Sequence, residues 1–341
     1  MFPQLTIDLD KLEKNARVVV DACSQHGIEV VGVTKGCLGD LKIAQAMLKG
    51  GVAGFADSRV GNLRKLRILD PPYLMLLRQP MLDEHLEAVE FADVSFVTEY
   101  AAAYKLSEAA SRLERTHRII LMVETGDLRE GVPALLLEKT VKKILDLKWL
   151  KIEGLGTNIA CSGGTSSASE SLELLAAVAK QVQEKFSLNF AVISGGNSSA
   201  WKAVEAAKIP PEINQLRIGE AILLGQETTN FEPLPATHQD VFLLSAEVLE
   251  VNEKSICNDQ AEELSRRQAV VALGKQDIGG GQLKLLLEGA RIWRVSSDHL
   301  VIDLSGVSKG LNVGDKLTFV PDYFALLGAM TSPFVNKNFL D

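Results

Sequence analysis

Alternation of short apolar runs with helix-like stretches is the feature of this sequence that most limits its fold. Eight runs have strand character, at 30–33, 52–56, 73–77, 94–97, 119–123, 152–155, 190–193 and 216–218. Stretches with helical periodicity separate most of them, most clearly at 41–49, 101–113, 133–147, 169–186 and 200–207. Eight such units in about 220 residues predict an α/β protein built on a parallel (β/α)8 TIM barrel. An open doubly wound sheet is the alternative that periodicity alone leaves open.

The sequence changes character after the proline-punctuated stretch 231–235. Strand-like patterns follow with weak helical periodicity and glycine-rich turns, at 241–251, 268–273, 292–304 and 316–320. We therefore predict a barrel domain at 9–230 and a mostly antiparallel β domain at 235–341. The alternating segment 1–8 is expected to pair with the second domain, and the polar segment 255–263 is expected to be a loop.

Composition narrows the class of protein and its surroundings. A net charge of −8 argues against nucleic-acid partners and against binding to an anionic membrane surface. No window has the length of apolar sequence that spans a membrane, and the N-terminus has no signal-peptide pattern. The cysteines are widely spaced and form no CxxC pair, which favours a reducing, cytoplasmic location; they are Cys23, Cys37, Cys161 and Cys257.

A lysine, Lys35, follows the first of the apolar runs, where a barrel strand would end. Taken alone, it is a loop lysine that points to water. The alternative is a lysine in an apolar pocket whose pKa is lowered, so that its amine can act as a nucleophile. Chemistry in barrels of this kind collects at the carboxyl ends of the strands, which is where Lys35 is predicted to lie.

Two glycine- and serine-rich turns follow the last two predicted barrel strands. The segment 195–199 (GGNSS) precedes a predicted helix. The segment 217–220 (RIGE) is a second polar turn with a glycine, at the end of the next predicted strand. Backbone amides and hydroxyls in such turns suit a phosphate, although either turn alone is a weak signal. A phosphorylated aldehyde that bonds to the amine of Lys35 would satisfy all three features, and pyridoxal phosphate is such a cofactor.

Lys35 and the two turns belong to a larger set of segments whose residues, taken together, match the sequence of one enzyme family. The segments are 7–11, 32–35, 56–59, 75–81, 126–131, 156–158, 193–199, 216–221, 272–277, 297–300 and 329–332. Together they resemble the alanine-racemase-like (fold type III) pyridoxal-phosphate enzymes, most closely the ornithine racemase branch. The resemblance covers nearly the whole chain. It implies a pyridoxal-phosphate-dependent isomerase that interconverts L- and D-amino acids by two-base proton exchange at Cα.

The resemblance also implies roles for individual residues. Lys35 would carry the cofactor covalently and act as one of two acid/bases. Arg217 would face the pyridine nitrogen and keep it unprotonated, because a guanidinium does not readily give up a proton. Arg129 would reach the substrate carboxylate, with Asn158 near the ring. The phosphate would be held by Asn197, Ser198, Gly219, Glu220 and Tyr323.

Four positions depart from the family pattern. Gly39 stands where a phosphate-binding tyrosine is expected, Met122 where a modified barrel lysine is expected, and Asn158 where a histidine is expected. Lys275 stands in place of the tyrosine that serves as the opposite-face base.

The second base is therefore open among Lys275, Asp298 and His299. The family's shared active sites imply that it would be contributed by the partner subunit of a homodimer. The plain alternatives are a surface lysine, a turn aspartate and a histidine satisfied by neighbouring groups. No metal ligand set is expected.

Three other functions fit the same fold. Non-catalytic pyridoxal-phosphate homeostasis proteins are a barrel alone, so the additional β domain argues against them. A D-amino-acid aldolase would use a His/Cys or His/Asp metal pair near the C-terminus, and His299 with the distant Cys257 fits poorly. A decarboxylase of this fold type is usually longer. Ornithine is implied as substrate by the resemblance alone, and other basic or small amino acids stay open.

Overall fold

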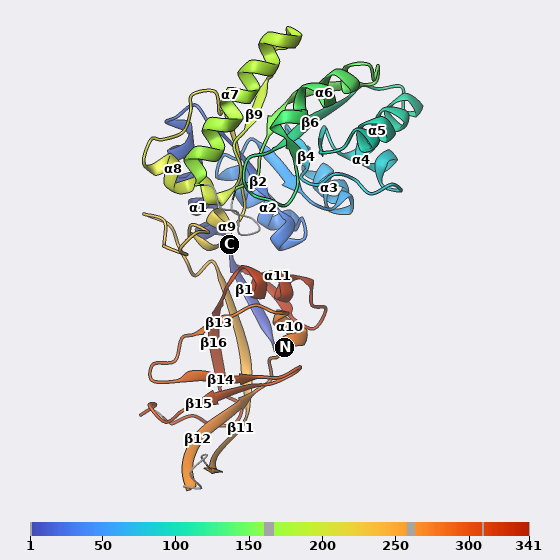
Figure 1. Cartoon of the computed structure of the whole chain (residues 1–341). Coiled ribbons are helices and arrows are strands. Elements are labelled where there is room, and N and C mark those ends of the chain that lie inside the picture. Colours follow the sequence, from blue (N-terminus) through green and yellow to red (C-terminus); the bar gives the residue numbers. More distant parts are fainter. Residues whose placement is uncertain (1, 160–166, 258–262, 309, 341) are drawn as a thin grey trace. The chain divides into compact units, whose positions relative to one another are not determined.

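The computed structural model describes residues 2–159, 167–257, 263–308 and 310–340 (Figure 1). The chain divides into two compact units. The first consists of Leu12–Lys35 and Gly39–Thr237, and the second of Met1–Lys11, Gly36–Leu38 and His238–Asp341. In the part of the chain that is described, no helix has the length and apolar character needed to cross a membrane.

The first unit is a closed barrel of parallel strands. Its sheet runs in the order β5-β4-β3-β2-β10-β9-β8-β6, and pairing of β5 with β6 closes the circle. The strands are β2 (Glu29–Val33), β3 (Gly54–Asp57), β4 (Leu74–Leu76), β5 (Val94–Val97), β6 (His117–Glu124), β8 (Leu150–Gly156), β9 (Val192–Ser194) and β10 (Gln215–Ile218). A short strand, β7 (Val132–Pro133), adds to β6 outside the circle. Closure confirms the predicted barrel and rules out the open doubly wound sheet.

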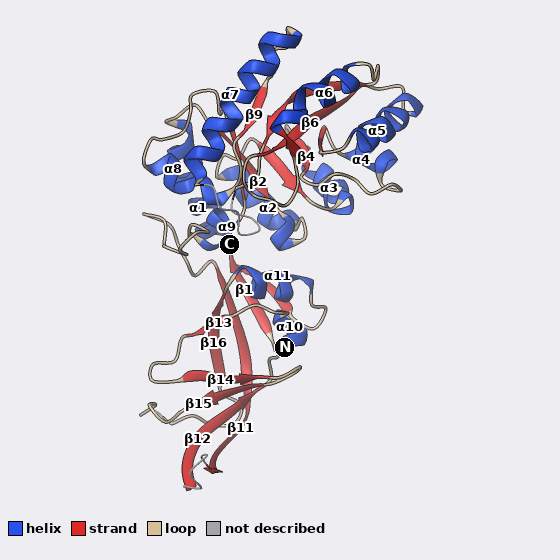
Figure 2. Ribbon diagram, viewed as in Figure 1, coloured by secondary structure: helices blue, strands red, loops and turns tan. Residues whose placement is uncertain are grey.

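Helices cover the outside of the barrel strands (Figure 2). The longest, α7, begins after Ser167, whose hydroxyl accepts from the amide of Glu170 while the Glu170 carboxylate accepts from the amide of Ser167. Its apolar positions recur at helical spacing and are buried. The helices are α1 (Leu9–Ser24), α2 (Leu41–Lys49), α3 (Val60–Leu66), α4 (His85–Phe91), α5 (Tyr100–Arg112), α6 (Ala134–Leu145), α7 (Ala168–Phe186), α8 (Trp201–Glu205) and α9 (Glu220–Leu224). Single 3₁₀ turns lie at η1 (Lys35–Cys37), η2 (Arg67–Leu69) and η3 (Ser198–Ala200).

The barrel interior is filled by side chains from the strands. One buried cluster consists of Val31, Val33, Ala56, Met75, Val94, Phe96, Ile120 and Met122. Met122 has no exposed surface, so in this chain the position packs as a core residue. Between β8 and β9 the backbones approach so closely that a Cβ added to Gly154 would lie 1.7 Å from the carbonyl oxygen of Val192. Only glycine fits at that position.

The second unit is a mostly antiparallel β domain, which confirms the remainder of the predicted fold class. Its strands run in the order β13-β16-β11-β12-β15-β14, and β1 pairs antiparallel with β11 and parallel with β17. In Figure 1 the blue β1 lies beside the later-coloured strands of this domain. The strands are β1 (Gln4–Asp8), β11 (Phe242–Cys257), β12 (Glu263–Val271), β13 (Leu283–Leu285), β14 (Arg291–Val295), β15 (Leu300–Asp303), β16 (Lys316–Pro321) and β17 (Asn336–Leu340). Two helices accompany them, α10 (Lys275–Ile278) and α11 (Tyr323–Thr331).

Two local expectations in this domain were wrong. The expected strand 292–304 is two strands, β14 and β15, because the chain turns where the amide of Ser296 donates to the carbonyl of His299 at 2.8 Å. Of the expected loop 255–263, the described residues 255–257 and 263 belong to β11 and β12, which pair as far as Cys257 with Glu263. An antiparallel ribbon can expose polar side chains to water, so its polar sequence is compatible with strands. Residues 258–262 of that segment, and Cys161 in the barrel unit, lie outside the described residues.

Candidate active site

The segment that leads to Lys35 is fixed by a buried carboxylate. Thr34, directly after β2, donates its amide to the carbonyl of Ala56 at 3.0 Å and its hydroxyl to Asp57 Oδ2 at 2.7 Å. Asp57 has no exposed surface and also accepts from the amide of Arg59 and from Asn62 Nδ2. Burial raises the pKa of Asp57, while these hydrogen bonds oppose the increase. The backbone just before Lys35 is therefore held in place by the hydrogen bonds of Thr34.

Lys35 itself is exposed in the single chain. It is the first residue of the 3₁₀ turn η1. Its strand pairs with β10, with Val31 opposite Arg217 and Gly32 opposite Ile218. A Cβ added to Gly219 would lie 3.0 Å from Cβ of Val33. Lys35 and the segment 217–220 thus follow the carboxyl ends of adjacent strands.

The two predicted phosphate turns meet at the same end of the barrel. The amide of Arg217 donates to the carbonyl of Gly196 at 2.9 Å, and the amide of Ala221 donates to Ser198 Oγ at 3.2 Å. Asn197 Oδ1 accepts from the amide of Ser199 at 3.1 Å, which starts η3. Gly196 has φ +107, a conformation that strongly favours glycine. The buried Ser198 hydroxyl thereby lies next to the start of α9, where Gly219 and Glu220 are found.

Arg217 is buried in the barrel and held by neutral oxygens. Its guanidinium donates to the carbonyl and hydroxyl of Ser194 at 3.2 and 2.6 Å, to the carbonyl of Thr157 at 2.6 Å and to Asn158 Oδ1 at 3.1 Å. It also lies 4.9 Å from the centre of the Phe96 ring. The guanidinium is therefore fixed in place as a permanent cation and hydrogen-bond donor.

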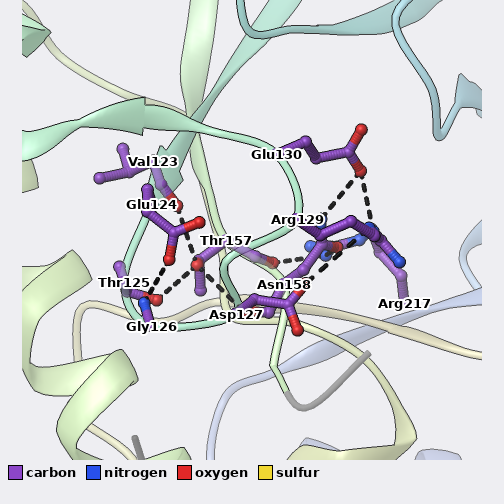
Figure 3. Close-up of polar contacts among 10 residues, drawn as sticks. All are labelled: Val123, Glu124, Thr125, Gly126, Asp127, Arg129, Glu130, Thr157, Asn158 and Arg217. Atoms are coloured by element: carbon purple, nitrogen blue, oxygen red, sulfur yellow. Dashed lines mark hydrogen bonds and ion pairs between the residues drawn. The ribbon is translucent and has the colours of Figure 1, made fainter. Parts of the chain in front are cut away.

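Arg129 and Asn158 come together through a carboxylate that the sequence did not single out (Figure 3). Glu130 Oε1 accepts from Arg129 Nη2 at 2.8 Å and from Asn158 Nδ2 at 3.1 Å. Asp127 Oδ2 lies 3.8 Å from Arg129 Nε. Asn158 is buried, whereas Arg129 and Glu130 are partly exposed. The loop after β6 thus delivers one arginine and one carboxylate to the buried end of β8.

Tyr323, at the start of α11, belongs to the second unit. Asp322 caps this helix, with Oδ1 accepting from the amide of Ala325 at 2.7 Å. The tyrosine ring lies against Gly36 of the same unit, where an added Cβ would be 2.9 Å from Cε2 of the ring. The contact leaves no room for a side chain at Gly36.

The three candidates for the second base lie together on the β domain. The amide of Lys275 donates to the carbonyl of Ser296 at 2.9 Å, and a Cβ added to Gly274 would lie 2.3 Å from the amide nitrogen of Asp298. His299 Nδ1 lies 3.2 Å from Asp298 Oδ1. A hydrogen bond from Ser297 and the neighbouring His299 lower the pKa of Asp298. Lys275 and Asp298 are exposed and His299 is half-buried, so none is enclosed within the single chain.

These groups fit a phosphorylated pyridine aldehyde. A primary amine, a buried arginine and two hydrogen-bonded turns with hydroxyl and amide groups gather at one end of the barrel, following neighbouring strands β2, β9 and β10. Gly219 approaches β2 closely there, and Gly196 needs its positive φ. The lysine suits an aldehyde carbon, the turns suit a phosphate, and the arginine suits a ring nitrogen acceptor.

Comparison with known proteins gives concordant matches. Residues 7–227 match the family described as alanine racemase, N-terminal domain. A lysine racemase of Thermotoga maritima is 38% identical, with 99% of this chain and 98% of that protein covered. An ornithine racemase of Acetoanaerobium sticklandii is 35% identical over 100% of both. A crystal structure of alanine racemase from Bartonella henselae with covalently bound pyridoxal phosphate has a TM-score of 0.76 at 16% identity, covering 99% of both chains.

Proposed function

As a member of the alanine racemase family, this chain is a pyridoxal-phosphate-dependent amino-acid racemase, an isomerase, and we propose that its substrate is ornithine or lysine. The observation that carries the substrate proposal is that two relatives, matched over 98% and 100% of their length, are named lysine racemase and ornithine racemase, and both of these amino acids carry a second amine. The family, enzyme class and cofactor expected from the sequence are confirmed. A non-catalytic homeostasis protein, an aldolase or a decarboxylase is not favoured.

Each residue of the site has a proposed task. When bound, pyridoxal phosphate supplies an electron-withdrawing system that stabilises negative charge at the substrate Cα. The ε-amine of Lys35 holds the cofactor covalently and, once released, moves a proton at Cα on one face. The phosphate is held by Asn197, Ser198, the backbone of Gly219 and Glu220, and Tyr323.

Arg217 is proposed to face the ring nitrogen. Its guanidinium is anchored by Ser194 and Thr157, and it can donate a hydrogen bond there while keeping its own protons. Keeping the ring nitrogen unprotonated limits the spread of negative charge, which suits simple proton exchange at Cα. Arg129 is proposed to bind the substrate carboxylate, and Asn158 lies between the two arginines.

A racemase needs a proton donor and acceptor on each face of Cα. For the face opposite Lys35 we propose one residue among Lys275, Asp298 and His299, contributed by the partner of a homodimer. Their exposure in the single chain supports this, because a second subunit could cover them. We also propose a cytoplasmic location, supported by Cys23, which is a free and buried thiol.

The test of substrate and first base uses the purified holoprotein in D₂O. Each of L-ornithine, L-lysine, L-alanine, L-serine and L-arginine is incubated in turn, and Cα deuterium and optical rotation are followed. We expect the diamino acids to exchange and racemise fastest. The variant Lys35→Ala is expected to lose the visible cofactor absorbance and the exchange. Fast turnover of alanine with slow turnover of ornithine and lysine would contradict the substrate proposal.

The second base is tested with the same assay, started separately from the L- and the D-enantiomer. Alanine replaces Lys275, Asp298 or His299, and Lys284→Ala serves as an exposed lysine control on β13. The true base should abolish abstraction from one enantiomer only. Mixing that variant with Lys35→Ala should restore about a quarter of the sites if they are shared between subunits. Normal racemisation by all three variants would show that the base lies elsewhere.

A further inference from the structure

Glu130 occupies a junction in the network at the end of the barrel. One oxygen, Oε1, accepts both from the guanidinium of Arg129 at 2.8 Å and from the side-chain amide of Asn158 at 3.1 Å (Figure 3). The side chain of Glu130 is 29% exposed and Asn158 is 7% exposed. The carboxylate therefore joins a partly exposed arginine to a buried amide.

The amide of Asn158 can satisfy its neighbours in one orientation only. Its Nδ2 faces the Glu130 carboxylate, and its Oδ1 faces the guanidinium of Arg217 at 3.1 Å. Rotating the amide by half a turn would set its oxygen against the carboxylate and its NH₂ against the guanidinium. Both contacts would then be repulsive, because a carboxylate only accepts and a guanidinium only donates.

The result is an ordered series of groups, Arg129–Glu130–Asn158–Arg217, in which each link joins a donor to an acceptor. Arg217 has further anchors in Ser194 and Thr157, so its place does not depend on Glu130. Arg129 sits on an exposed loop, and a charge-assisted hydrogen bond to Glu130 is a strong constraint on its side chain. Asp127 Oδ2, at 3.8 Å from Arg129 Nε, is beyond hydrogen-bond distance. Loss of the negative charge at Glu130 should therefore weaken both of its hydrogen bonds and loosen the side chains of Arg129 and Asn158.

We propose that Glu130 is a positioning residue that orients Arg129 and Asn158 for the substrate and cofactor. This inference rests on the racemase function proposed above. Glu130 touches neither substrate nor cofactor in this proposal. It acts through the two residues whose side chains it holds.

A matched control exists on the outer surface of the same unit. Glu138 on α6 likewise accepts from a cation, Lys185, and from an amide, Gln181 Nε2 at 3.0 Å. Its partners are exposed residues on α7. The variants Glu130→Gln and Glu138→Gln therefore remove the same charge from the same kind of junction, once inside the site and once outside it.

The experiment compares holoenzyme variants by three readouts: KM and kcat for ornithine and lysine, the visible absorbance of the bound cofactor across pH, and the thermal unfolding midpoint. The Gln amide oxygen can still accept from Arg129 and Asn158 but without the charge that strengthens both hydrogen bonds. We therefore expect Glu130→Gln to raise KM about three- to tenfold, to change kcat less than threefold, and to shift the pH dependence of the cofactor absorbance. Glu138→Gln should match the unsubstituted protein in the first two readouts. Equal unfolding midpoints for the two variants would exclude loss of folding as the cause.

A charge swap provides a second arm. Asn158→Asp alone places two carboxylates together and should be worse than Glu130→Gln. In the double variant E130Q/N158D, the amide introduced at position 130 can accept from Arg129 and donate to the carboxylate introduced at position 158. That carboxylate can in turn accept from Arg217. We expect the double variant to recover most of the loss in KM relative to N158D.

Unchanged KM and absorbance in E130Q, or no recovery in the swap, would overturn the proposal. If the unsubstituted protein binds the cofactor but racemises no amino acid, the proposed function fails instead. The absorbance readout would then still decide the role of Glu130.

Discussion

A fully buried histidine on β6 should make the stability of the barrel sensitive to acid. His117 has no exposed surface, and its Nε2 lies 2.9 Å from the hydroxyl of Ser95 on β5. Burial, aided by Arg115 and Arg118, lowers the pKa of His117 from 6.5 to about 3. The unfolded chain therefore takes up a proton as the pH falls below 6.5, whereas the folded barrel does not do so until near pH 3. Stability is lost as the pH falls through that window.

The size of the effect follows from the difference in proton binding. Each pH unit below 6.5 lowers the free energy of unfolding by about 1.4 kcal/mol until the folded-state pKa is reached. Between pH 7.5 and 4.5 the loss from this one residue is about 2–3 kcal/mol. That is a substantial share of the net stability of an ordinary domain.

The perturbation is His117→Gln, which places an amide near the position of Nε2 and does not titrate. Urea unfolding is followed by fluorescence at pH 7.5, 6.5, 5.5 and 4.5, with Trp149 and Trp201 reporting on the barrel unit. We expect the variant to be less stable at pH 7.5 but to have a flatter pH profile, so that the gap closes by about 2–3 kcal/mol at pH 4.5. The control is His26→Gln at an exposed position. Parallel profiles for the His117 variant and that control would refute the reasoning.

Two further substitutions test the packing of the barrel and the electrostatics of the β domain. Gly154→Ala forces β8 and β9 apart, so it should lower the free energy of unfolding, measured in urea, by more than about 3 kcal/mol. The control is Gly61→Ala in α3, where the added Cβ meets open space, and it should be neutral or slightly stabilising. Similar midpoints for the two would contradict the close approach. Asp303 is held by Ser305 and Arg291, which lower its pKa to about 2, so Asp303→Asn should cost about 1–2 kcal/mol at pH 7 after solvent screening. Its folded-state pKa is depressed, so this difference should fade between about pH 4 and 2. A constant difference down to pH 2, measured through Trp293 fluorescence, would show that the charge is not responsible.

The barrel could be predicted from the sequence because its signals are local. Each strand is a short apolar run followed by a helical pattern, so all eight strands were located to within a few residues. The β domain has fewer such signals. The helix α11 (YFALLGAMT) is apolar on nearly every face and shows no helical alternation. The strand β17 is recognisable through its pairing with β1, which lies more than 300 residues earlier.

The candidate site shows the same division between local and distant information. Lys35 and the turns at 195–199 and 217–220 were predicted because polar residues follow apolar strands, a pattern visible along the chain. Glu130 could not be predicted in this way, because its interest depends on a hydrogen bond with Asn158, which follows a different strand. The shared position of Lys275, Asp298 and His299 likewise depends on a turn folding back onto α10.

The strand β1 has a consequence for the order of events during synthesis. Its neighbours β11 and β17 are encoded after the entire barrel, so β1 emerges from the ribosome about 230 residues before its first partner. At ordinary rates of translation that interval is roughly 10–50 s. Throughout it, Leu5 and Ile7, which are fully buried in the finished domain, have no native strand to cover them. The barrel can mature while the chain grows, but β1 must wait for β11, so a nascent chain stalled before residue 242 would present a folded barrel preceded by an unpaired, aggregation-prone strand.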